Sequence, residues 1–339
     1  MQSPLTTVAV DAMSGDRGTV VIVDAVRQVF QSRSDVHLLL VGDPDIIKKH
    51  IGTEPLPEGR YSIVPADQVV TMEDTAAVAL RNKKTSSMRV AINMVKEGRA
   101  ASAVSAGNTG ALMAISRFVL KTAPGIDRPA ICTTIPAIDG HTHMLDLGAN
   151  IDCTAEHLYQ FACMGSILAE AVDGVKAPRV GLLNIGSEDM KGNEQVKDAA
   201  ELIGNSDLNY IGFVEGNEIY TDRVDVVVCD GFVGNISLKT SEGVARMVSH
   251  YLKEEFKRNP LNKLIGLFAM PILKAFRKRI DPRRYNGASL LGLQGVVIKS
   301  HGSADAFAFA NAIEIGLLES GSDVPTMIAS QLSTAETAA

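Results

Sequence analysis

The sequence predicts an α/β fold with an open, largely parallel sheet flanked by helices. Two observations carry this prediction. Short apolar segments end in glycine or polar residues, and each is followed by a stretch with helical periodicity. This alternation is typical of βα units, whose parallel strands are joined by right-handed crossovers. In addition, a chain of 339 residues with 46% hydrophobic and 21% charged residues can bury a large core.

The expected strands share runs of Val, Ile, Leu and Ala that are bounded by Gly, Asp or Asn. They fall at residues 6–13, 36–42, 61–65, 101–107, 130–136, 143–148, 179–186, 209–214 and 225–231. The expected helices share apolar residues three or four positions apart. They fall at residues 18–31, 85–97, 109–121, 154–173, 191–204 and 304–319. Ligands of such sheets bind where strands end, so the polar loops after the strands are the places to search for a site.

Composition excludes several classes of protein. The formal net charge of -6 argues against a broad nucleic-acid-binding surface, which is usually basic. The four cysteines lie far apart, and no cluster of His, Cys, Asp or Glu indicates a metal site. The N-terminus lacks a signal-peptide pattern, and no apolar run approaches the roughly 20 residues of a spanning helix. We therefore expect a cytoplasmic protein without a metal or a nucleic-acid partner.

Residues 1–330 are expected to form a single α/β catalytic unit. Within it, residues 253–284 carry ten Lys/Arg and three Asp/Glu, a local charge of +7 that leaves -13 on the rest of the chain. We expect this segment to be a basic amphipathic helical insertion. The last residues are rich in Ser, Thr and Ala, so 331–339 are expected to form a flexible tail.

The first candidate anion-binding loop is Ser-Ala-Gly-Asn-Thr-Gly-Ala at 105–111, between a strand and a helix. Glycine lets the backbone approach a ligand, and free amides at a helix start favour an anion. The candidates for binding phosphate or an acyl oxygen are Gly107, Asn108, Thr109 and Gly110. The alternative is an ordinary helix cap with tight-turn glycines. Asp11 ends the first strand and is a candidate for organising the same cleft.

The second candidate loop, residues 183–193, also lies between a strand and a helix. Lys191 supplies a positive charge beside the free amides of the helix start, although a lone lysine is usually a solvated surface charge. Glu188 could hold this lysine in an ion pair or cap the helix. The other candidates for binding substrate in this loop are Asn184, Gly186 and Asn193.

The third candidate loop, residues 229–239, follows the β-branched run 224–228. Asp230 at the carboxyl end of a strand suits catalysis or the orientation of a donor, and it suits equally a helix cap. Gly234 lies in the loop that could hold phosphate. Asn235 and Lys239 are four residues apart, so a helix would present both on one face.

A fourth loop, Lys-Ser-His-Gly-Ser-Ala-Asp at 299–305, precedes the last expected helix. His301 could donate a proton to a leaving group, because the unperturbed pKa of histidine lies near neutrality. The alternative is a structural histidine in a turn.

Together these loops resemble those of the PlsX-type phosphate acyltransferases, in the same order from Asp11 to about Gly316. The segments that carry the resemblance are Asp-Ala-Met-x-Gly-Asp at 11–16, Ser-Ala-Gly-Asn-Thr-Gly-Ala at 105–111, Asp-Leu-Gly-Ala-Asn at 146–150, Leu-Leu-Asn-Ile-Gly at 182–186, Lys-Gly-Asn at 191–193, Cys-Asp-Gly-Phe-x-Gly-Asn at 229–235, Tyr-Asn-Gly-Ala at 285–288 and Lys-Ser-His-Gly at 299–302. Two positions depart from the family pattern, Ser14 in place of a common glycine and Ser187 in place of a frequent acidic residue.

The resemblance implies transfer of a long-chain fatty acyl group from acyl carrier protein to inorganic phosphate. The product is an acyl phosphate for glycerol-3-phosphate acylation in phospholipid biosynthesis. The resemblance also implies a fold similar to the isocitrate and isopropylmalate dehydrogenases, a homodimer and no cofactor. The main alternative is a phosphotransacetylase-like enzyme that acts on short-chain acyl coenzyme A. A dehydrogenase is disfavoured because no glycine-rich dinucleotide fingerprint is found, and a non-catalytic membrane-surface scaffold is the remaining alternative.

Within this resemblance each candidate residue has an expected role. Phosphate is largely dianionic near neutral pH and needs no covalent enzyme nucleophile, so the protein must position it and stabilise charge. The loops 107–110 and 231–235, with Lys191, are expected to hold phosphate. Asn184, Asn193 or Asn235 is expected to stabilise the oxyanion, and His301 is the expected proton donor. The cysteines are expected to be small buried residues.

The basic segment combines apolar and cationic side chains, the pattern of an interfacial helix. We expect a helical hairpin, bent at Pro271, that lies on an anionic membrane surface near a membrane-bound glycerol-3-phosphate acyltransferase. The expected contact residues are Leu264, Phe268, Arg277, Lys278 and Arg279. The alternatives are a dimerisation or core helix with a solvated basic face, and a docking site for the acidic carrier protein.

Overall fold

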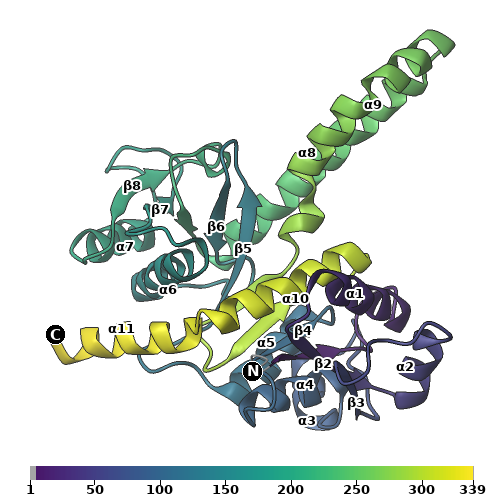
Figure 1. The fold of residues 1–339 in the computed structure, drawn as a ribbon. Helices are drawn as coiled ribbons and strands as arrows, with labels where there is room; N and C mark the ends of the chain where they lie inside the picture. The colour runs from purple at the N-terminus through teal and green to yellow at the C-terminus, as the bar shows by residue number, and fades with distance from the viewer. Residues whose placement is uncertain (1–4, 339) are drawn as a thin grey trace.

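The computed structural model describes residues 5–338, in which an α/β body of two lobes carries a projecting helical arm (Figure 1). One sheet runs through both lobes. In spatial order its strands are β3 (Tyr61–Pro65), β2 (Val36–Gly42), β1 (Thr6–Asp11), β4 (Ser102–Ser105), β11 (Val296–Lys299), β10 (Ala288–Leu291), β5 (Ala130–Pro136), β6 (His141–Leu145), β9 (Val226–Val228), β7 (Val180–Leu183) and β8 (Tyr210–Val214). The predicted α/β class with a largely parallel sheet is therefore confirmed.

Antiparallel pairing in the middle of the sheet determines where the site loops lie. The pairs β11–β10, β10–β5 and β5–β6 are antiparallel, whereas the other neighbouring strands in the described part of the sheet are parallel. Strand direction is consequently reversed between the lobes. The carboxyl ends of β1, β4 and β11 lie at one edge of the sheet, and those of β6, β9 and β7 lie at the other.

Helices cover the sheet, and polar side chains cap most of them by accepting a hydrogen bond from a backbone N–H in the first turn. The α-helices of the body are α1 (Thr19–Ser32), α2 (Pro44–Ile51), α3 (Ala76–Asn82), α4 (Ser87–Lys96), α5 (Thr109–Leu120), α6 (Ala155–Asp173), α7 (Glu194–Gly204), α10 (Ala306–Gly321) and α11 (Val324–Ala338). Two short 3₁₀ helices, η1 (Glu218–Tyr220) and η2 (Pro282–Tyr285), complete it.

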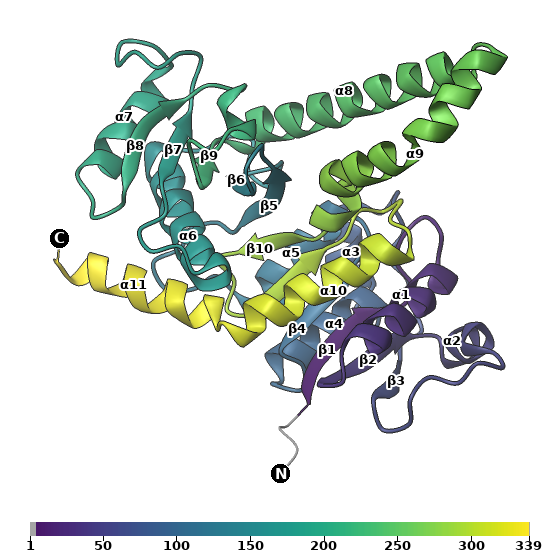
Figure 2. The same cartoon turned by 45° about the horizontal axis from the view of Figure 1, so that its top comes forward.

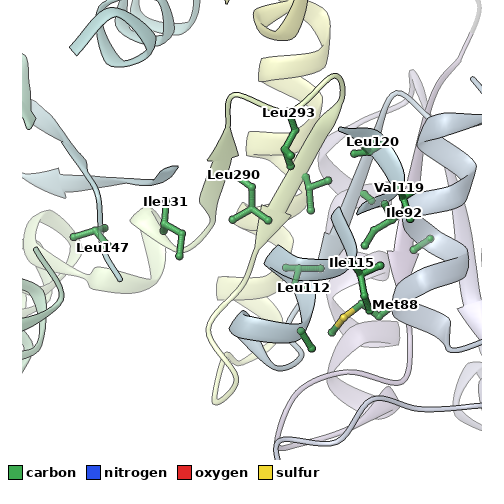
Figure 3. Close-up of a cluster of buried hydrophobic side chains, with 14 of the residues drawn as sticks. Met88, Ile92, Leu112, Ile115, Val119, Leu120, Ile131, Leu147, Leu290 and Leu293 are labelled. Atoms are coloured by element: carbon green, nitrogen blue, oxygen red, sulfur yellow. The ribbon is translucent and has the colours of Figure 1, made fainter. Parts of the chain in front are cut away.

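A continuous apolar core joins the two lobes. Figure 3 shows Met88 and Ile92 of α4 grouped near Leu112 of α5, and Leu290 of β10 between this group and Ile131 of β5. All five are buried, and burial of a large apolar side chain contributes about 1.5–3 kcal/mol. This packing fixes the position of the loops at either end of the strands.

Apart from α11 and the 3₁₀ helices, the body elements that are absent from the sequence-based prediction are β10, β11, α2 and α3. All are short, and β10 and β11 are only 4 residues long, so neither produces a periodic pattern that can be recognised locally. The expected strand 143–148 is also wrong at both ends, because β6 starts at His141 and stops at Leu145. The expected helix 191–204 begins only at Glu194, where Asn193 caps it.

The projecting arm consists of α8 (Gly231–Lys257) and α9 (Pro260–Ile280), which meet at the tip of the arm and diverge toward the body in Figure 2. The predicted position of the hairpin turn, Pro271, is wrong, because Pro271 lies inside α9. The chain reverses instead at 258–259, because Asn259 caps α9 and Pro260 follows at its first position. The arm is therefore longer than the expected insertion at 253–284. In the part of the chain that the structure describes, no helix has both the length and the apolar character needed to cross a membrane.

The carboxyl-terminal stretch is helical further than expected. The helix α11 runs to Ala338, so most of the segment 331–339 belongs to it, and Ala339 lies outside the described residues. Leu332 is buried and packs in the core of the second lobe. This apolar contact explains why the helix does not stop near Ser330.

Candidate active site

The loops after β1, β4 and β11 form one hydrogen-bonded unit. The hydroxyl of Ser105 donates to the Asp11 carboxylate at 2.6 Å and accepts from the N–H of Gly107 at 3.1 Å. The hydroxyl of Ser14 donates to the carbonyl of Asp11 and accepts from the N–H of Ala106. Asp11 is buried, and desolvation raises the pKa of its carboxyl group. The buried Asp11 thus positions the 105–107 loop through these hydrogen bonds and does not face a ligand.

Asn108 begins α5 and ties it to a neighbouring loop. Its Oδ1 accepts from the N–H of Ala111, and its Nδ2 donates to the carbonyls of Met72 and Asp74. The side-chain amide is therefore occupied in the fold. Within the described residues, the N–H groups of Thr109 and Gly110 donate to no protein acceptor, so both remain for an anion.

The loop after β11 lies directly beside this helix start. Ser300 donates its N–H to the carbonyl of Ser105 at 2.9 Å, and Asp16 donates its N–H to the carbonyl of Gly302 at 2.8 Å. Asn286 holds the loop from the other side, because its Nδ2 donates to Ser300 Oγ and its Oδ1 accepts the N–H of His301. These hydrogen bonds hold His301 near the start of α5.

The hydrogen bonds of His301 determine its tautomer. Nδ1 accepts from the N–H of Ser303 at 3.2 Å and lies 2.9 Å from the hydroxyl of the same residue. A neutral ring that accepts at Nδ1 carries its proton on Nε2. Partial burial lowers the pKa of His301. The carboxylates of Glu242 and Asp16 oppose this shift, and the charges of Lys239 and Lys299 add to it. The ring is neutral at pH 7, with Nε2–H available as a donor.

Two lysines from different lobes converge on this histidine. Lys299 ends β11, and Lys239 comes from α8 with a 3.4 Å ion pair to Glu242. The pKa of Lys299 is lowered to about 8, mainly by burial; Asp16 opposes this shift and Lys239 adds to it. Lys299 is thus protonated at pH 7 although burial disfavours its charged form. Groups with such perturbed pKa values are common in functional sites. The sequence prediction did not assign a role to it.

The loop after β7 forms a separate group. Lys191 folds over Gly186 and makes a 2.9 Å ion pair with Glu188, and this pair raises the pKa of Lys191. Asn184 closes the loop by donating to the carbonyl of Lys191 and accepting from the N–H of Ile185. Asn193 accepts from the N–H of Val196 as the cap of α7. The side chains of Lys191 and Glu188 are exposed, so a ligand can reach them.

The residues expected in a loop after β9 form instead the first turns of α8, which pack against the loop after β6 through glycine. A Cβ atom on Gly234 would overlap the carbonyl of Asp146, and Asn235 lies against Gly148. Asp146 is buried and accepts hydrogen bonds from the N–H groups of Ile131, Ala149 and Asn150. Asp230 caps α8 by accepting the N–H of Val233 at 2.9 Å.

Known proteins are similar to this chain over almost its entire length. The model of a family described as "Fatty acid synthesis protein" matches residues 6–325. A phosphate acyltransferase of Nitrosococcus oceani is 58% identical over 96% of this chain and 96% of its own. A phosphate acyltransferase of Alcanivorax borkumensis is 57% identical over 97% of this chain and 98% of its own.

The chain belongs to the phosphate acyltransferase family. It is thus an acyltransferase of fatty acid and phospholipid synthesis, and the family, the enzyme class and the pathway predicted from the sequence are confirmed. Among solved structures, a phosphotransacetylase from Streptococcus pyogenes superposes with a TM-score of 0.65 at 16% identity, covering 93% of this chain and 94% of that one. A 4-hydroxythreonine-4-phosphate dehydrogenase from Klebsiella pneumoniae gives a TM-score of 0.52 at 11% identity, covering 94% and 98%. These two likenesses show the fold.

The candidate site residues thus fall into two groups of loops. The first group contains Asp11, the 107–110 loop, Lys299 and His301, and α8 adds Lys239. The second contains the Lys191 loop and the start of α8 with Asn235. Among the described residues no direct contact joins Lys191 to His301. The helix α8 links the two groups. Asn235 in its first turn belongs to the second group, and Lys239, one turn later, lies near His301 of the first group.

The cysteines of this phosphate acyltransferase are poorly suited to be nucleophiles. Cys132, Cys163 and Cys229 are buried, and all four cysteines are reduced. Burial raises the pKa of the half-buried Cys153 to about 12 and that of Cys163 to about 11. A thiol that remains protonated at pH 7 does not attack a thioester. This agrees with direct attack by phosphate.

Proposed function

We propose that this enzyme transfers a long-chain fatty acyl group from acyl carrier protein to inorganic phosphate at the loops around His301. One observation carries the proposal: two unpaired amides of α5, the cation Lys299 and the Nε2–H of His301 lie around one loop cluster. The amides and the lysine suit a dianion, and the imidazole suits a developing negative charge. The product would be an acyl phosphate for glycerol-3-phosphate acylation.

The reaction needs one bond formed and one broken. A phosphate oxygen attacks the thioester carbonyl, and the tetrahedral oxyanion collapses with loss of the carrier-protein thiolate. We assign phosphate to the amides of Thr109 and Gly110, with Lys299 and Lys239 as counter-charges. His301 donates a hydrogen bond from Nε2 to the oxyanion or to the departing sulfur. A neutral imidazole suffices, because a thiolate whose thiol has a pKa of about 8.5 leaves readily.

The second group of loops supplies the remaining candidates. Lys191 and the amides of Asn184, Asn193 and Asn235 are proposed to contact the acyl donor or to complete the phosphate site when donor binds. In support, Lys191 is exposed beside Gly186, whose lack of a side chain gives the lysine its path. Asp230 is proposed to act through the start of α8, which it caps.

A second candidate function is a phosphotransacetylase-like reaction with short-chain acyl coenzyme A. The shared fold with the Streptococcus pyogenes phosphotransacetylase favours it, although a likeness at 16% identity concerns the fold alone. The same fold argument extends to the dehydrogenases, and kinship with the isocitrate and isopropylmalate dehydrogenases remains a proposal.

The deciding experiment measures release of free thiol from palmitoyl acyl carrier protein, with and without inorganic phosphate. Hydroxylamine added to the product mixture traps any acyl phosphate as a hydroxamate. Phosphate-dependent thiol release with hydroxamate formation supports the proposed reaction. Turnover of acetyl coenzyme A, with none of the carrier-protein substrate, would instead establish the second candidate.

The exposed arm suggests how the acyl phosphate product could reach the acyltransferase that uses it. We propose that the enzyme is a cytoplasmic homodimer that touches the anionic inner face of the cell membrane through α9. In support, no described residue of α9 is buried, Leu264 and Phe268 are 52% and 76% exposed, and Arg277, Lys278 and Arg279 fill the last turn. Such an arrangement would deliver acyl phosphate to a membrane-bound acyltransferase.

A further inference from the structure

Three side chains that are distant in the sequence meet at the end of the second lobe, away from the proposed catalytic loops. His141 and His143 lie two residues apart on β6 and therefore point to the same face of the sheet. Asp173 is the last residue of α6, which crosses that face. The Nε2 atoms of His141 and His143 lie 3.0 and 2.6 Å from Asp173 Oδ2.

We propose that His141, His143 and Asp173 form a binding site for a divalent transition metal, with zinc as the favoured ion. All three ligand atoms lie within 4.8 Å of one another. A zinc ion about 2.0–2.2 Å from each of them in tetrahedral geometry places ligand atoms about 3.3 Å apart. The carboxylate must therefore retreat by less than about 1 Å, and the fourth position stays open for water.

The backbone holds the ligands in register before any ion binds. His143 pairs with Thr134 of β5 on one side and Val226 of β9 on the other, and its side chain is only 5% exposed. The two imidazole rings meet edge to face at 84° with centroids 5.1 Å apart, which leaves both Nε2 atoms directed at the same carboxylate. Little conformational entropy is lost when such a site takes an ion.

Thr134 provides the outer contact that metal-binding histidines need. Its hydroxyl lies 3.4 Å from Nδ1 of His143. Without metal, Nε2–H of His143 donates to Asp173 and Nδ1 accepts from Thr134. With metal, Nε2 becomes the ligand and Nδ1–H donates to the same hydroxyl, which can accept equally well. The ring therefore needs no rotation to change roles.

The electrostatics and the exposure also fit a cation. The carboxyl end of α6 carries the negative end of the helix dipole, and it ends in the Asp173 carboxylate. A further carboxylate, Asp225, adds to the field at His141 while paired with Arg179 at 2.8 Å. His141 is 33% exposed, so an ion can enter from its side.

The ligand chemistry selects the ion. Two imidazoles and one carboxylate suit zinc and its neighbours in the transition series, whereas magnesium and calcium prefer oxygen ligands. The site lies at the start of β6, and the site loop 146–150 follows the end of that strand. Four residue steps along a strand span about 14 Å, so the ion would not meet the substrates. Its effect would be to clamp α6 to the central sheet.

The test uses the full-length chain without an affinity tag, stripped with a chelator and then titrated with Zn²⁺ against a chromophoric competitor. We expect one Zn²⁺ per chain, visible d–d bands of a tetrahedral site with Co²⁺, and a higher thermal midpoint. His141→Ala and Asp173→Asn should each weaken Zn²⁺ binding by at least about tenfold, and Thr134→Val by about tenfold. Mg²⁺ should have no effect.

His250→Ala is the matched control, because that histidine is exposed on α8 and paired with Glu254. Binding that survives in this variant and is lost in His141→Ala supports the site. The absence of stoichiometric Zn²⁺ binding by the wild-type chain would overturn the proposal. Equal Zn²⁺ affinity in the wild-type and His141→Ala proteins would overturn it as well. Since His141 is partly exposed, its variant should fold, and circular dichroism verifies this.

Discussion

The backbone N–H of Ser303 donates to Nδ1 of His301 at 3.2 Å, and this contact assigns the imidazole its chemistry. The lone pair of Nδ1 accepts this hydrogen bond from the protein, so Nε2–H remains available to donate to the substrate. Because the pKa of His301 is lowered by partial burial and by two lysines, the ring acts as a hydrogen-bond donor rather than as an imidazolium acid.

His301→Ala should lower kcat/KM for palmitoyl acyl carrier protein by about 10²-fold, the usual loss of one donor to an oxyanion. His301→Gln, which can place an amide N–H near the Nε2 position, should recover part of this loss. The phosphate KM should change little, since His301 contacts the acyl group in this assignment. Loss of phosphate affinity without loss of kcat would place the ring at the phosphate instead.

Lys299 makes phosphate use dependent on pH. Its folded pKa is about 8, below the usual 10.5, so the charge is present at pH 7 and lost as pH rises through 8. The rate constant kcat/KM for phosphate should therefore fall above about pH 8. Lys299→Arg should move this fall to higher pH, because the guanidinium stays charged. A pH profile identical in both proteins would contradict the assignment.

Lys299 should also oppose stability. Between pH 8 and the usual 10.5 the unfolded chain binds more protons than the folded one, so stability rises with pH in that window. Below pH 8 the charged lysine is held in a partly desolvated place at a cost. Lys299→Met should thus raise the thermal midpoint at pH 7 while raising the phosphate KM by about 10- to 150-fold. Kinetics and calorimetry on one sample measure both effects.

Ser105→Ala tests the hydrogen bonds that hold the proposed phosphate-binding loop at 105–110. It removes the 2.6 Å donor to the buried Asp11 carboxylate and the acceptor of the Gly107 N–H. We expect a loss of about 1–3 kcal/mol in unfolding free energy, measured by denaturant titration, together with weaker phosphate binding. Ser303→Ala, in the exposed turn, is the control that should leave stability nearly unchanged. Unchanged stability in Ser105→Ala would show that another group satisfies Asp11.

Local sequence patterns were sufficient for the βα units but not for the middle of the sheet. The runs at 36–42 and 61–65 coincide with β2 and β3, because each is apolar and bounded by turn residues. The strands β10 and β11 depend on partners that are distant in the sequence: β11 pairs with β4 and β10 with β5. Four residues without periodicity carry no local signal of such pairing.

The grouping of the site residues could not be predicted for the same reason. The antiparallel strands reverse direction between β11 and β6, which separates Lys191 from His301, although both loops follow strands. The convergence of Lys239 with Lys299 depends on the path of α8 across the lobes. By contrast, Asp230 as a helix cap was foreseeable, because Asp followed by an apolar helix is a common start.

Lys191→Ala and Asn235→Ala test whether the second group of loops takes part in turnover. Both should reduce kcat without unfolding the protein, because the ion pair of Lys191 is exposed and contributes little stability. Lys197→Ala, an exposed lysine on the following helix, is the matched control and should retain full turnover. Wild-type activity in a folded Lys191→Ala variant would remove this lysine from the site.

The exposed apolar side chains of the arm predict binding to anionic vesicles. Replacing Leu264 and Phe268 together by serine should lower the partition coefficient onto phosphatidylglycerol vesicles by about 10- to 100-fold, because both side chains lose their transfer free energy. Stability should not fall, since neither residue is buried. Leu318→Ser on α10, where Leu318 is 49% exposed, is the control away from the arm. If vesicle binding stays unchanged while thiol release from palmitoyl acyl carrier protein falls, α9 serves as the carrier-protein dock, and the membrane proposal is wrong.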